Sequence, residues 1–318
     1  MRVNHMESYY IGIDVSKEHL DVDYCGEGKR YRNEAIQIRQ LLSELEELKK
    51  QNKLVLVICE ATGGYEQKIV RACHELKVPI HVAHANKVRH FAKSKGILAK
   101  TDKIDGRVLS DYGRLLNPEA DSILLTENAE KIRELLRRRE QLQEDKKRET
   151  NRSDKITSID ISDSIKAHID WLDKAIKEID KKLSSLKKAE DIEKDYQLLT
   201  SIPAVGNLAA HYLLSYLPEI GKLSSKALAA LVGVAPYNQD SGNSKGKRFI
   251  KGGRSNLRKV LYMCSITATR CNSDLKAFYL RLRSKGKQAK VAIIAVMHKL
   301  IRMANSVLQR GTPWEESY

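Results

Sequence analysis

The 318-residue sequence lacks the cysteine patterns of metal-binding and disulfide-rich proteins. Its five cysteines, at positions 25, 59, 73, 264 and 271, include no Cys-x-x-Cys pair. This argues against structural zinc and against a disulfide framework. No apolar run approaches 18 residues, and no signal-peptide-like apolar segment follows the first basic residue. We therefore expect a cytoplasmic protein that neither binds nor crosses a membrane.

The sequence also lacks Gly-x-Gly-x-x-Gly and Walker motifs, which argues against dinucleotide-binding and P-loop folds. Its first 118 residues instead show short strands and then alternating helices and strands. The predicted elements are strands at 9–14, 20–25 and 30–33, a helix at 35–50, a strand at 54–59, a helix at 65–77 and a strand at 80–83. A leading hairpin followed by alternating α and β elements favours an RNase H-like (RuvC-like) α/β domain over residues 1–118.

Proline is absent between Pro118 and Pro203, and this charged stretch is predicted to be helical. Apolar residues within it follow a 4-3-4-3-4-3 spacing, which is typical of a coiled-coil seam. They are Ile165, Ile169, Leu172, Ile176, Ile179, Leu183 and Leu186. The seam could join two chains or pack within one, with a helix near 127–148 as antiparallel partner and 150–164 as the turn. Residues 119–196 are predicted to form this coiled-coil connector.

Acidic residues are almost absent from one long segment. Between Ser241 and Arg310 the sequence has 17 lysine and arginine residues and a single acid, Asp274, whereas the remainder has 40 basic and 40 acidic residues. A segment of net charge +16 joined to a neutral body indicates a surface that faces a polyanion, most simply nucleic acid. The segment belongs to residues 197–318, which we expect to form a mostly α-helical C-terminal domain.

Four carboxylates stand where they could bind a divalent cation. Asp14 ends the first predicted strand, Glu60 ends the buried strand, and Asp102 and Asp105 share one face of a helix running to about residue 116. Four carboxylates that meet at one sheet edge need a cation, and a pair of Mg²⁺ ions suits in-line phosphoryl transfer. Each acid alone could instead be a cap or a surface charge. The rival acids, which lie inside elements, are Asp21, Asp23 and Asp111.

A serine stands at the start of the basic segment, in a glycine-rich loop. Ser241 is followed by a helix that carries Arg254 and Arg258 four residues apart, where both could clamp one phosphate. An exposed hydroxyl and neutralised phosphate oxygens are what serine attack on a phosphodiester requires. A phosphate-binding loop without chemistry is the simpler alternative, Ser244 is a competing nucleophile, and Tyr262 is expected in the core. Further nucleic-acid contacts are expected from Lys245, Lys247, Arg248 and Lys251.

Two weaker patterns complete the sequence. The segment Ile202–Gly206 before a predicted helix at 207–217 resembles a helix-hairpin-helix element, in which N–H groups at a helix start hold a phosphate. Ala204 stands where the first glycine is usual, and a plain packed turn is the alternative. A histidine cluster without zinc-site spacing is expected to be structural or to face RNA. Its members are His81, His84 and His90.

These motifs together resemble those of the DEDD-type insertion-sequence transposases of the IS one-ten family, which are related to the Piv-like DNA invertases. The matching N-terminal segments are Ile11–Lys17, Glu60–Gly63 and Lys100–Asp105. The matching C-terminal segments are Ile202–Gly206, Gly233–Pro236, Asp240–Gly242 and Gly252–Tyr262. The resemblance covers nearly the whole chain, and the order and spacing of the segments are specific. One departure is Gly106, where the family often has alanine.

The resemblance implies a DNA recombinase guided by a noncoding bridge RNA. It implies that Asp14, Glu60, Asp102 and Asp105 bind Mg²⁺ in a RuvC-like domain. It further implies that Ser241 attacks donor and target DNA and forms a covalent 5′-phosphoserine link. Homodimers and tetramers are implied too, with the serine of one subunit completing the metal site of another, at the nucleoid of a bacterium or archaeon. No histidine lies near this serine, so we hypothesise activation by the metal or by a carboxylate of the N-terminal domain.

Two rival functions are consistent with parts of the pattern. A metal-dependent nuclease of the Holliday-junction type would cleave with the carboxylates and use Ser241 only to bind phosphate. A nucleic-acid-binding module without catalysis would leave the four-carboxylate pattern unexplained. Of the three functions, the recombinase alone requires a serine-linked DNA adduct.

Overall fold

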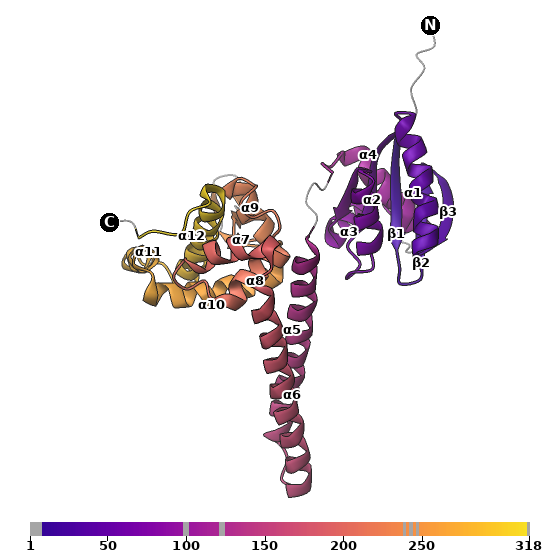
Figure 1. The fold of residues 1–318 in the computed structure, drawn as a ribbon. Helices are drawn as coiled ribbons and strands as arrows, with labels where there is room; N and C mark the ends of the chain where they lie inside the picture. The colour runs from indigo at the N-terminus through magenta and orange to yellow at the C-terminus, as the bar shows by residue number, and fades with distance from the viewer. Residues whose placement is uncertain are drawn as a thin grey trace. The chain divides into compact units, whose positions relative to one another are not determined.

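The computed structural model describes residues 8–97, 102–120, 125–237, 240–241, 244–245 and 248–316. The side chains of residues 102–104, 240–241 and 244–245 are not among the described ones. The chain divides into two compact units, 1–124 and 125–318, and each is treated by itself below (Figure 1). The three-domain division at 1–118, 119–196 and 197–318 stays a prediction.

The N-terminal unit is built on a five-stranded mixed sheet with the order β3-β2-β1-β4-β5. Its strands are β1 (Tyr9–Val15), β2 (His19–Tyr24), β3 (Glu27–Arg32), β4 (Leu54–Glu60) and β5 (Ile80–Ala83). The first three strands pair in antiparallel fashion, whereas β4 is parallel to both β1 and β5. The structure thus confirms the α/β fold that the sequence predicts.

Two pairs of helices cover the two faces of this sheet. The helices are α1 (Ala35–Lys50), α2 (Gln67–Glu75), α3 (Ala85–Ser94) and α4 (Asp102–Leu116). Val57 and Cys59 of β4 are buried in the core beneath α1 and α2, while Leu56 and Ile58 are buried in the core beneath α3 and α4. Because successive side chains of a strand point to opposite faces, a strand covered on both sides needs the continuous apolar run seen here.

Helix α4 lies directly on β1 because glycines form their contact. A Cβ added to Gly12 would lie 2.0 Å from the carbonyl oxygen of Gly106, and one added to Gly113 would lie 2.2 Å from the side chain of Ile58. A Cβ on Gly106 would lie 3.2 Å from the carbonyl oxygen of Asp21. Only residues without a side chain allow the helix and strand backbones to approach this closely.

Substituting Gly12 by alanine is expected to destabilise the N-terminal unit by about 3 kcal/mol, because the new methyl group overlaps backbone that has no alternative position. Gly28→Ala, in β3, is the matched control, since its added Cβ would meet nothing within 4 Å. Urea unfolding of the full chain measures both variants. Equal stability of the two would show that the α4–β1 contact does not depend on Gly12.

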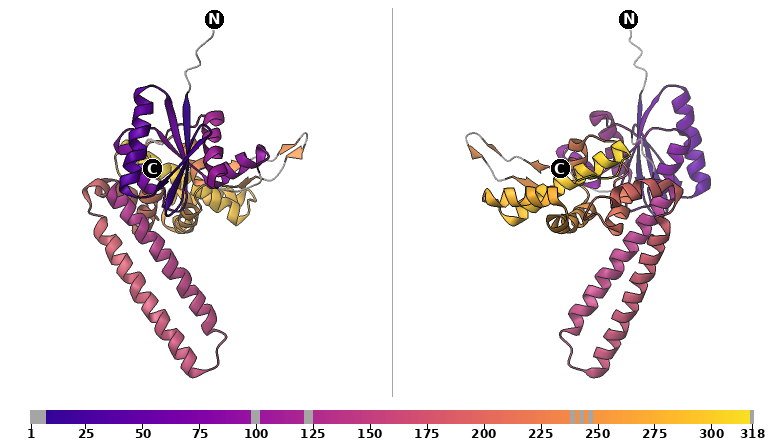
Figure 2. Two further views of the ribbon diagram at one scale, coloured as in Figure 1. Left: turned by 90° about the vertical axis from the view of Figure 1, so that its right-hand side faces the viewer. Right: turned by 60° about the vertical axis from the view of Figure 1, so that its left-hand side comes forward.

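The C-terminal unit begins with a long antiparallel helical hairpin of α5 (Glu127–Ser153) and α6 (Ile159–Leu186) (Figures 1 and 2). Leu142, Leu172 and Ile176 form a buried cluster between the helices. The ion pairs Arg139–Asp180 at 2.7 Å and Lys146–Asp173 at 2.6 Å also join them. Pairing within one chain is therefore observed, and the turn is shorter than predicted because α5 continues to residue 153. Coiled-coil packing between chains stays a prediction.

The remaining helices surround one buried core, to which the base of the hairpin also contributes. They are α7 (Glu190–Thr200), α8 (Asn207–Tyr216), α9 (Ser225–Val232), α10 (Ser255–Cys271), α11 (Ser273–Ser284) and α12 (Ala289–Arg310). By length and composition alone α12 could cross a membrane, but half of its most apolar window is buried inside the protein. The core helix of a soluble protein has the same properties, so α12 is weak evidence for a membrane span.

The turn between α7 and α8 adopts the backbone conformation of the glycine that the helix-hairpin-helix pattern expects. The amide of Val205 donates to the carbonyl oxygen of Ile202 at 2.9 Å, and Ala204 has a left-handed φ of 84°. Proline at the second position and a positive φ at the third are typical of a type II turn, in which glycine is preferred at the third. Ala204 therefore replaces the usual glycine but adopts the same backbone conformation. DNA contact by this turn stays a prediction.

Candidate functional site

Asp14 and Glu60 lie next to each other at one end of the sheet. In the parallel pair of β1 and β4, Ile13 lies opposite Cys59, so the two acids follow at the same edge. Ile13 and Cys59 enter the core beneath α1 and α2. Alternation along each strand therefore places both acids on the other face, which α4 covers. Each is partly buried.

Helix α4 brings Asp105 to the same end of the sheet. The helix runs antiparallel to β1, because Gly106 meets Gly12, whereas a Cβ added to Gly113, two turns further on, would lie 3.0 Å from the ring of Tyr10. The first turn of α4 therefore extends past Gly12 toward the end of β1. The name carboxylate edge is used below for Asp14, Glu60, Asp102 and Asp105.

The donor set of the carboxylate edge suits a divalent metal ion. Carboxylate oxygens are the ligands that hard divalent cations prefer, and side-by-side carboxylates repel one another without such a charge. Among the side chains that the structure describes, no three acids, histidines or cysteines form a metal-binding group, and the side chain of Asp102 lies outside them. Metal binding by these four residues stays a prediction.

The three rival acids have other partners within the N-terminal unit. Asp21 accepts a hydrogen bond from Arg30 Nε at 2.7 Å. Asp23 accepts one from the hydroxyl of Ser110 at 2.5 Å. Burial of Asp111 works against its charge, but hydrogen bonds from two cations, Lys95 and Arg114, outweigh burial and lower the pKa of its carboxyl group. Each rival therefore holds strands or helices together.

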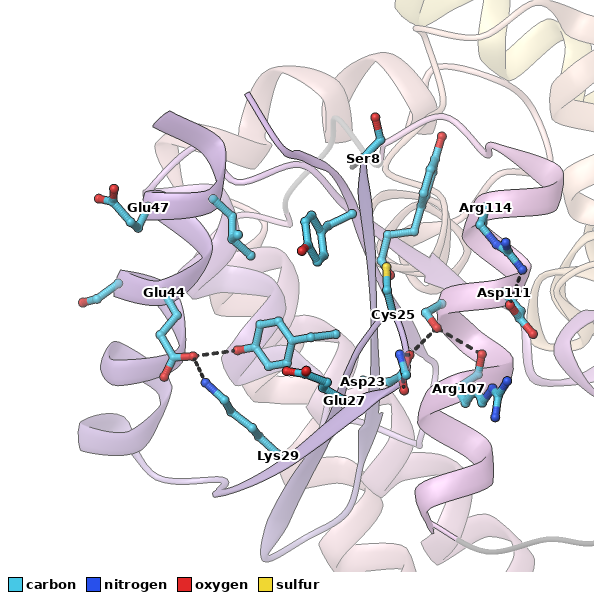
Figure 3. A pocket seen from close by; sticks show the side chains of 17 residues that line it. Ser8, Asp23, Cys25, Glu27, Lys29, Glu44, Glu47, Arg107, Asp111 and Arg114 are labelled. Carbon is cyan, nitrogen blue, oxygen red and sulfur yellow. Dashed lines mark hydrogen bonds and ion pairs between the residues drawn. The ribbon is translucent and has the colours of Figure 1, made fainter. Parts of the chain in front are cut away.

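A hollow of about 1050 Å³ lies at the opposite end of the sheet (Figure 3). Tyr9 at the start of β1 and Tyr24 at the end of β2 line it, together with Arg107 of α4. Lys29 and Glu44 of its wall form an ion pair at 2.7 Å. The hollow is therefore separate from the carboxylate edge.

Ser241 belongs to an arm of short strand pairs that extends away from the helices of its unit (Figure 2). The strands are β6 (Pro236–Tyr237), β7 (Asp240–Ser241), β8 (Ser244–Lys245) and β9 (Phe249–Ile250). β6 pairs with β9, and β7 with β8, which places the backbone of Ser241 opposite that of Ser244. The name serine arm is used below for these four strands. The side chains of both serines lie outside the described residues.

The two ends of the serine arm cross in direct contact at its root. A Cβ added to Gly233 would lie 2.2 Å from the carbonyl oxygen of Gly252, and one added to Gly253 would lie 2.4 Å from the amide nitrogen of Gly233. All three glycines have a positive φ, at which other residues are strained. The glycines of this motif therefore fix where the arm leaves the helical core.

Arg254 and Arg258 bind protein groups at this root. Arg254 forms a two-pronged ion pair with Glu219, at 2.6 and 2.5 Å, and also donates to the carbonyl oxygen of Tyr216 at 2.8 Å. Arg258 donates to the carbonyl oxygens of Val232, at 3.3 Å, and of Gly252. The predicted phosphate clamp stays a prediction, but clamping would require both guanidinium groups to leave these partners. Sequence reasoning missed Glu219 because it is 35 residues from its partner and belongs to no motif.

The other predicted contact residues have varied environments. Arg248 and Lys251 are exposed, while the side chains of Lys245 and Lys247 lie outside the described residues. Tyr262 packs against the core of its unit, as predicted.

Two of the three clustered histidines have structural contacts. The rings of His81 and Tyr112 are stacked, with their centroids 6.4 Å apart. His84 caps α3, because its side chain accepts a hydrogen bond from the amide of Asn86. His90 is exposed on α3.

Comparison with known proteins agrees with this arrangement. A model of DEDD transposases of the IS110 type matches residues 11–157, and a model described as the transposase IS116/IS110/IS902 family matches residues 196–280. The first match contains the carboxylate edge and the second contains the serine arm. The fold and these matches define a DNA-processing enzyme of the transposase class. The chain belongs to the IS110 (IS one-ten) family of transposases.

Relatives of similar length extend the likeness to nearly the whole chain. Pilin gene-inverting proteins of Moraxella bovis and Moraxella lacunata are 26% and 27% identical to it, over 98% of this chain and 99% of each relative. An uncharacterized 43.6 kDa protein of insertion element IS110 from Streptomyces coelicolor is 28% identical over 120 residues, which is 37% of this chain and 30% of that protein. Membership of the family implies DNA substrates, and the DEDD domain indicates a divalent metal ion.

A double-mutant cycle tests the root of the serine arm. Arg254→Gln and Glu219→Gln should each lower the free energy of unfolding by about 2 kcal/mol, and the double variant should lose little more than either, because each removes the same ion pair. Urea unfolding and DNA affinity are measured on all three variants. If Arg254 instead held a phosphate, Arg254→Gln alone would weaken DNA binding and the two substitutions would be additive.

Proposed function

We propose that this protein cuts and rejoins DNA strands through a covalent 5′-phosphoserine at Ser241, using a RuvC-like N-terminal domain. The observation that supports this most is the contact of α4 with β1, which gathers Asp105 and the start of α4 at the edge that bears Asp14 and Glu60. The strand order, with a leading antiparallel hairpin and a parallel β1-β4-β5 half, supports the RNase H-like assignment.

The carboxylate edge would supply negatively charged oxygen atoms at fixed positions. Its four acids would hold Mg²⁺, which when bound stabilises charge on the scissile phosphate and orients the reacting oxygens. Rigid attachment matters here because a small displacement of a catalytic group costs a large part of the rate. The glycine contact between α4 and β1 provides that rigidity through backbone.

The serine would carry the DNA strand between cutting and rejoining. The Oγ of Ser241 attacks phosphorus, the bond from phosphorus to the 3′-oxygen breaks, and the serine proton passes to that leaving oxygen, by way of a carboxylate. Rejoining reverses the step when a 3′-hydroxyl attacks the phosphoserine, and serine regains its proton. The basic segment Ser241–Arg310 supports contact with the DNA backbone. The Moraxella relatives are named as gene-inverting proteins, which favours rejoining over cleavage alone.

A noncoding bridge RNA would choose the donor and target sites, as the family resemblance implies. Homodimers or tetramers would form, and the serine of one subunit would act with the carboxylate edge of another. Exposed apolar side chains on α6 support such an assembly, since Ile159 is 77% and Trp171 is 54% exposed. The complex would act in the cytoplasm, at the nucleoid.

Ser241→Ala is expected to abolish covalent protein–DNA adducts on a denaturing gel, because no hydroxyl is left to form the phosphoester. Binding of the guide RNA should stay near normal. Ser244→Ala is the matched control on the facing strand and should still form adducts. Strand exchange by Ser241→Ala would refute the assignment, and metal-dependent nicking without any adduct would favour the resolvase-type nuclease.

Asp14→Asn and Asp105→Asn are each expected to lower strand exchange at least 100-fold, since each removes a negative oxygen from the predicted metal-binding set. Asp111→Asn is the control, because this acid lies on the same helix but is paired with Lys95 and Arg114. Removal of divalent ions with EDTA should stop the reaction of the unmodified protein. Recombination that continues in EDTA would show that the carboxylate edge does not act through a metal.

A further inference from the structure

The apparent neutrality of the chain outside its basic segment conceals a second basic surface. Residues 76–101 contain six lysine and arginine residues and no acid. Within this stretch α3 buries Val88 and exposes Lys87, Arg89 and Lys93. Among the described residues no acid forms an ion pair with these three cations, whereas Lys95 pairs with Asp111. Arg89 and Lys93, four residues apart, lie on one side of α3, whereas Lys87 lies on the other flank of Val88. The side that bears Arg89 and Lys93 therefore has uncompensated positive charge.

This basic side begins at the carboxylate edge. In the parallel pair of β4 and β5, Glu60 lies opposite Ala83, and the amide of Ala61 donates to the carbonyl oxygen of Ala83 at 3.1 Å. Helix α3 starts two residues later, at Ala85. A phosphodiester chain that reaches Glu60 can therefore continue along α3.

An exposed aromatic ring lies on the other loop that leaves this edge. The loop joins Glu60 to α2 and bears Tyr65, whose surface is 48% exposed. Glu66 is 7% exposed and accepts hydrogen bonds from the amide of Gly64 at 2.7 Å and from the hydroxyl of Thr62 at 3.1 Å. The buried carboxylate of Glu66 thus holds the loop in one conformation.

Asn33 anchors the same loop from the neighbouring strands. Its side chain is almost fully buried and donates to the carbonyl oxygens of Ser16, at 2.9 Å, and of Tyr65, at 3.3 Å. Lys68 donates to the carbonyl oxygen of Asn33 at 2.9 Å. Because the backbone of Tyr65 is already ordered, a ligand that stacks on its ring pays little to immobilise the loop.

Proteins that bind single strands combine a basic surface for the phosphates with aromatic rings on which bases stack. A duplex hides the faces of its bases, so a ring can stack only on an unpaired base. We propose that the carboxylate edge receives DNA as an unpaired single strand, with a base stacked on Tyr65 and the adjoining phosphates along Arg89 and Lys93. This inference rests on the proposed function and names the form of DNA that enters its metal site.

Binding of short single-stranded and duplex DNA to the full chain tests the stacking role. Tyr65→Ala should weaken single-strand binding about tenfold and leave duplex binding unchanged, whereas Tyr65→Phe should bind as the parent does. A 2-aminopurine base in the strand should be quenched by the parent and by Tyr65→Phe, and should stay bright with Tyr65→Ala. Unchanged single-strand affinity and quenching in Tyr65→Ala would overturn the proposal.

Salt dependence tests the basic side. For the single strand, the double variant Arg89→Gln/Lys93→Gln should reduce the slope of log affinity against log salt by about 1.4, from two lost phosphate contacts. Arg39→Gln/Lys50→Gln removes two exposed cations from α1, on the opposite face of the sheet, and should leave the slope unchanged. Equal loss in both double variants would show non-specific attraction and overturn the proposal. Stronger binding of an RNA strand of the same sequence, lost through the same substitutions, would also overturn it.

These measurements require binding and no strand exchange. Absence of a phosphoserine adduct would therefore refute the proposed function while a Tyr65-dependent preference for single strands still stood. All variants change exposed side chains, and thermal unfolding at the parent temperature confirms that they are folded.

Discussion

The carboxylate edge depends on the direct contact between the backbones of α4 and β1. Gly12 lets the helix reach the strand, and Gly113, two turns further along the same helix face, extends the close approach to Ile58 and Tyr10. Glycine inside a helix costs about 1 kcal/mol relative to alanine, so two glycines in α4 make the isolated helix weaker. In return, the contact fixes the start of α4 at the strand ends that bear Asp14 and Glu60.

Patterns along the chain predicted much of this arrangement. The run Leu54–Cys59 indicated a strand covered on both faces, and the acids at the ends of two strands indicated a shared edge; both features depend on local periodicity and on simple sheet topology. The glycine contact could also be predicted from the sequence. A glycine within an apolar strand often marks a close approach of another backbone segment, and Gly12 is such a residue. The sequence did not indicate why Gly106 stands where the family often has alanine, because the backbone that it approaches, at Asp21, belongs to another segment of the chain.

Other features could not be predicted because they depend on the path of the chain in space. Nothing near Arg254 in the sequence indicates that Glu219 is its partner, and an arginine in a basic loop suggests a phosphate until the ion pair is seen. The heptad spacing of α6 identified its buried face correctly at Leu172 and Ile176. The turn was predicted too long, because residues 150–153 contain neither proline nor glycine to end α5 and weak periodicity was the only available signal.

The net charge of a chain does not show how charge is distributed over its surface. A count that balances 40 basic against 40 acidic residues hides the acid-free stretch 76–101, because the compensating acids lie on other elements, such as Glu44 and Glu47 of α1. Screening limits surface electrostatics to about 8 Å in physiological salt, so distant acids cannot neutralise α3. Each unit therefore has its own group of basic residues, on α3 beside the carboxylate edge in one and in the segment that begins at Ser241 in the other. If the carboxylate edge and Ser241 act on one phosphate, as proposed, each unit has cations with which to hold the strand.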